Sequence, residues 1–76
     1  MDQNAIARYA KLILSMPKAS EADEKAKAVC DDIIGKIKTN EKPVALKKIS
    51  EVLTQCKIDS TEEETRMIYD EIRSLI

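Results

Sequence analysis

The segment from Ser20 to Lys38, SEADEKAKAVCDDIIGKIK, carries the longest helical pattern of apolar residues in the chain. Its stripe has the spacing of one helix face and consists of Ala22, Ala26, Val29, Cys30, Ile33 and Ile37, with Ile34 beside it. Charged residues fill the opposite face. Because an isolated amphipathic helix is unstable in water, this one is expected to bury its stripe against other helices. We therefore predict that the fold is organised around it.

The boundaries of this helix follow from its terminal residues. Ser20 and Asp23 have the spacing of a capping box, which predicts a start at Ser20. Gly35 marks either a close helix crossing or an early end, and we favour continuation to Lys38 because Ile37 still fits the stripe. Three stabilising i,i+4 pairs are predicted on its surface: Glu21–Lys25, Asp23–Lys27 and Asp32–Lys36.

One helix is predicted on each side of this segment. The first runs from Met1 to Met16, is capped by Asp2 or Asn4, and is halted by Pro17. The other follows the loop at positions 39–42 and has Pro43 in its first turn. Its stripe consists of Leu46, Ile49, Leu53 and Cys56, with Ala45 and Val52 beside it.

A last helix is predicted after the loop at positions 57–59, where Ile58 is expected to turn inward. Ser60 and Glu63 form the predicted capping box. The apolar stripe consists of Ile68, Ile72 and Leu75, with Thr65, Tyr69 and Ile76 adjacent. Four helices joined by short loops predict one all-α domain over residues 1–76, an antiparallel up-down four-helix bundle.

Composition excludes several classes of function. The 76 residues include no His, two Cys and one Gly, so a metal cage is not expected and no cofactor is predicted. With 13 basic and 14 acidic residues, no strong global charge recruits nucleic acid. The longest apolar run is Leu12 to Leu14, and the first residues lack the apolar core of a signal peptide. We expect a cytoplasmic protein with reduced cysteines.

No arrangement of residues predicts catalysis. Cys30 and Cys56 both lie on apolar stripes, so they are either small buried hydrophobic residues, which we favour, or a disulfide or redox switch. Neither has a His or a cationic cluster to lower its pKa, and adjacent acids on a helix point in different directions. We predict that the protein is not an enzyme.

Charge is segregated along the chain. The stretch 36–48 has a balance of +4 and the stretch 59–71 a balance of −5. The lysines either contact anionic lipid headgroups or an acidic partner, or they keep the loop soluble and pair with the last helix. Tyr69, Arg73 and Ile76 form a possible partner-binding edge, although such a tyrosine more often covers the core rim with its hydroxyl in water.

Four segments together resemble the pediocin-like (class IIa) bacteriocin immunity proteins of the enterocin A immunity type. They are RYAKLIL at positions 8–14, SEADEKAK at 20–27, NEKPVALKKISEVL at 40–53 and MIYDEI at 67–72. The resemblance covers nearly the full length and rests on spacing and residue character.

This resemblance implies a non-catalytic cytoplasmic bundle that protects the producing cell by recognising a membrane sugar permease engaged by the bacteriocin. It also implies that the C-terminal half selects the bacteriocin. The candidate partner-binding residues are Lys42, Lys57, Tyr69, Arg73 and Ile76, with Lys42 near the inner leaflet of the membrane. The alternative function is a small helical protein-binding regulator or adaptor of phage or plasmid origin.

Overall fold

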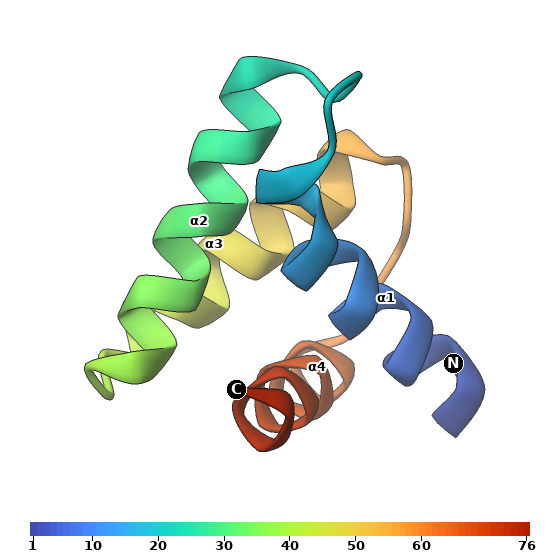
Figure 1. Ribbon diagram of the computed structural model, residues 1–76. Coiled ribbons are helices and arrows are strands. Elements are labelled where there is room, and N and C mark those ends of the chain that lie inside the picture. The colour runs from blue at the N-terminus through green and yellow to red at the C-terminus, as the bar shows by residue number, and fades with distance from the viewer.

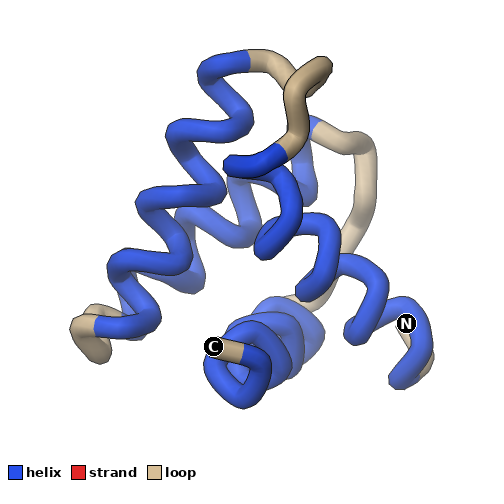
Figure 2. The backbone as a smooth tube through the Cα atoms, in the orientation of Figure 1, coloured by secondary structure: helices blue, strands red, loops and turns tan.

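The computed structural model describes residues 1–76 as helices joined by short loops, with no strand (Figures 1 and 2). The elements are α1 (Gln3–Ser15), the short 3-10 helix η1 (Met16–Lys18), α2 (Glu24–Lys38), α3 (Lys42–Gln55) and α4 (Glu62–Leu75). The predicted all-α four-helix bundle is confirmed.

The helices pack mainly as two pairs, α2 with α3 and α1 with α4. α2 and α3 are antiparallel and are joined by a turn at residues 39–41, which projects from one corner of the molecule (Figure 1). α4 is seen end-on in that view, whereas the other three helices are seen from the side. The axis of α4 therefore lies across the others, and its apolar face contacts α1, α2 and α3.

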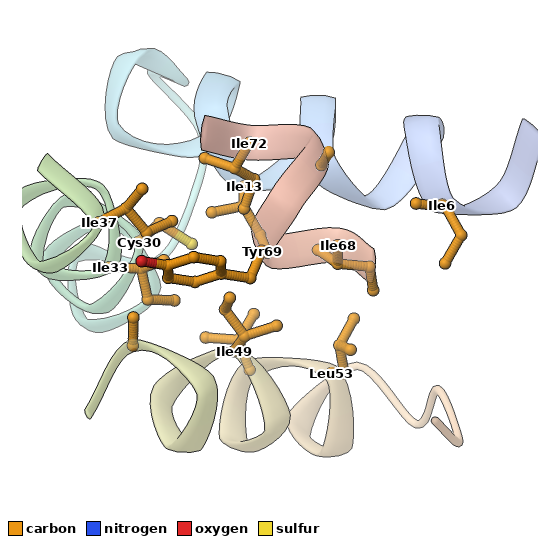
Figure 3. Packing of buried hydrophobic residues seen from close by; sticks show 13 residues of the cluster. Ile6, Ile13, Cys30, Ile33, Ile37, Ile49, Leu53, Ile68, Tyr69 and Ile72 are labelled. Carbon is orange, nitrogen blue, oxygen red and sulfur yellow. The ribbon is translucent and has the colours of Figure 1, made fainter. Parts of the chain in front are cut away.

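The core is a cluster of 13 buried residues to which all four helices contribute (Figure 3). They are Ile6, Ala10, Ile13, Cys30, Ile33, Ile37, Ala45, Ile49, Val52, Leu53, Ile68, Tyr69 and Ile72. The stripe of α2 supplies its innermost residues, Cys30, Ile33 and Ile37, to this cluster. Burial of the predicted stripe is confirmed for these three residues, whereas Ala26 and Val29 are only half-buried and Ala22 precedes the helix.

The start of α2 differs from the prediction. The helix begins at Glu24, its N-cap is Asp23, and the Asp23 side chain makes no capping hydrogen bond, so the predicted box at Ser20 is wrong. The chain continues past α1 as η1, with Pro17 in its first turn, and residues 19–23 are then needed to reverse direction. The three predicted i,i+4 pairs are also absent, because Lys27 pairs with Glu24 at 3.5 Å and Asp32 pairs with α3.

Gly35 lies inside α2, which continues to Lys38 as predicted. A Cβ atom added at Gly35 would meet nothing within 4 Å, so this glycine does not mark a close helix crossing. We expect Gly35→Ala to raise the free energy of unfolding by about 1 kcal/mol, because alanine loses less backbone entropy in a helix. Urea unfolding checks this. The reciprocal control is Ala28→Gly at an exposed site of α2, which should lower stability by a similar amount.

The last helix is capped one residue later than predicted. Thr61 is the N-cap: its hydroxyl accepts the Glu64 N–H at 3.1 Å, and the Glu64 carboxylate accepts the Thr61 N–H at 2.8 Å. The predicted box at Ser60 and Glu63 is wrong, because the Ser60 hydroxyl is hydrogen-bonded to the Thr65 hydroxyl at 3.1 Å. The stretch Ser-Thr-Glu-Glu-Glu offers two overlapping boxes, and packing of Thr65 selects the second.

Helices α2 and α3 are each followed, two positions after their last residue, by a left-handed residue: Asn40 (φ 61°) and Lys57 (φ 59°). After Lys57, the Ile58 N–H donates to the Leu53 carbonyl at 2.8 Å, which completes a Schellman motif. This turn directs Ile58 against the core, and its predicted inward position is confirmed. The two turns fix where α3 and α4 start, and with them the spacing of the candidate residues.

Candidate partner-binding site

Lys42 and Tyr69 are brought together at the start of α3. The Lys42 ammonium lies 5.2 Å from the centroid of the Tyr69 ring, within the range of a cation–π interaction. Lys42 is exposed, but Tyr69 is only 1% exposed and its ring lies among Ile33 and Ile49 (Figure 3). The Tyr69 ring is therefore part of the core, and the expectation that it covers only the core rim is wrong.

The burial of Tyr69 follows from the orientation of α4. The buried residues of this helix are Thr65, Ile68, Tyr69 and Ile72, the i, i+3, i+4, i+7 pattern of one face. This face is rotated from the predicted stripe, so Leu75 is 47% exposed instead of buried. Tyr69 therefore supplies core packing, and after Ile72 the remaining residues of α4 are exposed.

The last turn of α4 presents an exposed surface, which we call the α4 terminal surface and define as Arg73, Leu75 and Ile76. Leu75 and Ile76 are each 47% exposed. Arg73 is exposed and makes no ion pair, one helical turn beyond Tyr69. Arg73 and Ile76, three residues apart, lie on the same side of the helix end, whereas Leu75, two residues after Arg73, points to a different side.

Lys57 lies apart from the other candidates. It follows α3, whereas Lys42 begins it, and 14 helical residues at about 1.5 Å each place the two ends roughly 20 Å apart. Lys57 adjoins the start of α4, whereas Tyr69 and Arg73 lie in its second half. Of the five predicted residues, only Lys42 and Tyr69 are therefore shown in contact, Arg73 and Ile76 lie at the end of α4, and Lys57 is distant from Lys42.

The lysines of the stretch 36–48 are only partly paired. Lys48 contacts Asp32 of α2 at 2.9 Å, and Lys36 contacts Glu41 at 3.8 Å. Neither partner lies on α4, so the predicted pairing with the last helix is wrong. α3 packs along α2 with its lysine-bearing start beside the end of that helix, so the nearest acids come from α2 and the turn.

Two ion pairs join separate elements and shift the pKa of their members. The hydrogen bond from Lys48 lowers the pKa of Asp32, and that of Lys48 is raised in return. The Met1 ammonium contacts Glu64 at 2.8 Å. This contact and the Thr61 N–H lower the pKa of Glu64, while the pKa of the Met1 amine is raised.

We expect stability to fall on both sides of neutral pH. Asp32 and Glu64 stabilise the fold above their ordinary pKa values of 3.8 and 4.5, and this is lost as pH falls through their lower folded values. The Met1 amine and Lys48 stabilise the fold below their ordinary pKa values of 8.0 and 10.5. This stabilisation is lost as pH rises through their higher folded pKa values. Unfolding midpoints measured across pH check the loss of stability on both sides. The double variant Asp32→Asn, Glu64→Gln should lose less stability at acid pH than the unaltered chain, and an equal loss contradicts this assignment.

The two cysteines occupy different environments. Cys30 is buried in the core, whereas Cys56 is exposed at the C-cap of α3, so the prediction that both are buried is wrong for Cys56. The stripe of α3 extends only to Leu53 because the helix ends at Gln55. Burial, with a smaller effect from Cys56, raises the pKa of the Cys30 thiol to about 11.

We expect one thiol to react quickly at neutral pH. An aromatic disulfide reagent should modify the exposed Cys56 of native protein in a fast phase, whereas Cys30 should react only as the fold opens. Cys56→Ser should abolish the fast phase, and Cys30→Ser should abolish only the slow one. Two fast thiols in native protein would contradict the burial of Cys30.

The remaining surface offers few sites for chemistry. A shallow groove between α3 and the start of α4 is lined by Leu46, Lys47, Glu51 and Arg66, with charges of both signs. No group of three or more His, Cys, Asp or Glu residues is placed to hold a metal ion. None of the helices is both long enough and apolar enough to span a bilayer. Nothing in the periodicity of the sequence indicated this groove, because it depends on how α3 and α4 cross.

Comparison with known proteins adds no relative. No family model, curated protein or solved structure matches this chain.

Proposed function

We propose that this chain is a non-catalytic, protein-binding bundle whose partner docks on the α4 terminal surface. The observation that carries the proposal is the exposure of Leu75 and Ile76, each 47% accessible, beside an Arg73 that has no ion-pair partner. Arginine is enriched at the centres of protein interfaces, and a partner that covers the two exposed apolar side chains gains from removing their surface from water.

A non-catalytic role is supported by the state of the nucleophilic groups. The Cys30 thiol is buried and its pKa is raised to about 11, which disfavours the reactive thiolate. The chain has no histidine to serve as a base for Cys56 or for a hydroxyl. We accordingly assign the protein to the binding class.

The biological role that we propose is bacteriocin self-immunity in the cytoplasm of the producing cell. In this role the α4 terminal surface recognises a membrane sugar permease that a pediocin-like bacteriocin has engaged. The support is the all-α four-helix bundle, the sequence resemblance over positions 8–72, and the placement of Arg73 and Ile76 on one exposed surface.

Expression in a sensitive strain, challenged with a panel of pediocin-like bacteriocins, tests this role. Protection against at least one bacteriocin is expected, and unchanged sensitivity to all of them contradicts the proposal. The double variant Leu75→Gln, Ile76→Gln should lose protection while remaining folded by circular dichroism. Leu12→Gln, which alters an exposed leucine of α1, is the matched control and should still protect.

Affinity capture from membranes and from cytosol separates this role from the alternative. Recovery of a sugar permease only in the presence of bacteriocin supports immunity. Recovery of a soluble regulator, lost with the Leu75 and Ile76 variant but kept with Leu12→Gln, would instead indicate a helical regulator or adaptor. In both cases the same surface is tested, so the experiment also decides whether the α4 terminal surface is the docking site.

A further inference from the structure

The outward side of α4 carries charges that alternate in sign along the helix. Glu63, Arg66, Asp70 and Arg73 follow one another at spacings of three or four residues, so they form one stripe on the side away from the core. All four residues are exposed. α4 lies at the lower edge of the bundle in Figure 1, with the other helices above it. This stripe, which we call the α4 charge stripe, is therefore open to a partner.

The charges of the α4 charge stripe are hardly used within the chain. Asp70 comes four residues after Arg66 and three before Arg73, spacings at which ion pairs form on a helix, yet it pairs with neither. Glu63 makes no ion pair either. The one ion pair of Arg66 is with Glu62 at 4.0 Å, and the Glu62 side chain is 92% exposed. The stripe thus presents charges of both signs that lack a firm partner.

We propose that the α4 charge stripe docks antiparallel on the same stripe of a second copy of this chain. The order of the charges is self-complementary about a two-fold axis at the level of Ile68. Glu63 and Arg73 lie five residues before and after that level, so each faces the opposite charge on the other copy. Arg66 and Asp70 lie two residues before and after it and pair in the same way. Parallel pairing in register would instead set like charges against each other, which is unfavourable.

The strength of this contact is limited by its length and its exposure. The two-fold axis makes each ion pair twice, but one exposed ion pair stabilises little. The stripe from Glu63 to Arg73 is roughly 15 Å long by the rise of its residues. The half-buried Met67 lies between Glu63 and Asp70 along the helix, close to the axis, and supplies an apolar contact. We therefore expect a weak dimer whose formation depends on salt.

Self-association goes beyond the proposed function and does not rest on it, because it requires no other protein. Arg73 belongs both to the α4 charge stripe and to the α4 terminal surface. A second copy and a docking partner therefore compete for this residue, and the dimer must dissociate before a partner can contact it.

Sedimentation equilibrium of the full chain over a range of protein concentrations tests the proposal. We expect a reversible monomer–dimer equilibrium at low salt that shifts to monomer in about 1 M salt, where the Debye length is about 3 Å. Arg66→Glu replaces two attractions by two repulsions and should weaken the association about tenfold. Asp70→Arg alone should weaken it similarly. The two substitutions combined exchange the charges and should restore the association, because opposite charges then face each other again.

The matched control reverses a charge far from the α4 charge stripe. Lys25→Glu, at an exposed site near the start of α2, changes the net charge as Arg66→Glu does and should keep the association within about twofold. A chain that stays monomeric at its highest concentration in low salt overturns the proposal, whether or not the stripe retains a different protein. Equal association of the Arg66→Glu variant, or a combined variant that stays monomeric, also overturns it. Failure of the immunity assay with intact self-association would contradict only the proposed function.

Discussion

Replacing Tyr69 by alanine is expected to lower the free energy of unfolding by about 3–5 kcal/mol, the range for removing a large aromatic side chain from a core. Tyr69 is 1% exposed and is the largest fully buried side chain in the molecule. A loss of this size approaches the whole stability of a domain this small, so the variant should be largely unfolded at physiological temperature. Urea or thermal unfolding followed by circular dichroism measures the effect.

Three variants separate this core role from a role in partner binding. Tyr69→Phe keeps the ring and should retain most of the stability. Lys42→Ala removes the exposed cation over the ring and should cost about 0.5–1 kcal/mol. Arg73→Ala alters the neighbouring exposed surface and should stay within about 0.5 kcal/mol. Near-normal stability of Tyr69→Ala would show that the ring is not part of the core.

Replacing Ile33 by alanine is expected to cost about 2–5 kcal/mol, because Ile33 is fully buried at the centre of α2 and its loss leaves a cavity. The next residue supplies a control of the same chemistry. Ile34 is only half-buried, so Ile34→Ala should cost less than half as much. Equal costs, measured by the urea midpoint at constant slope, would mean that α2 is rotated from the position described.

The helical architecture was predictable because periodicity and local signals agreed. The α2 stripe, Pro43 in the first turn of α3, and the continuation of α2 through Gly35 all follow from interactions within about one helical turn. The corrections arise where two local solutions compete. The capping box forms at Thr61 because the Ser60 hydroxyl is hydrogen-bonded to the Thr65 hydroxyl. α2 begins later than predicted because η1 extends the preceding helix.

The candidate site was less predictable because it depends on long-range placement. Nothing local to Lys42 indicates that its ammonium lies over Tyr69, or that Lys48 finds Asp32 on another helix. The stripe assigned to α4 included Leu75 and placed Tyr69 at its edge, whereas the crossing of α4 buries the ring and exposes the leucine. Arg73 and Ile76 do lie on one exposed surface, and their role in binding stays a prediction.

The Glu64 carboxylate, which caps α4 and contacts the Met1 ammonium, has a consequence for the order in which the fold assembles. The contact between these two residues closes a loop that contains α1, α2 and α3, and the entropic cost of closure grows with loop length. α2 and α3, in contrast, meet across a turn of residues 39–41 and form contacts close in sequence. We therefore expect the α2–α3 hairpin to form before α1 pairs with α4.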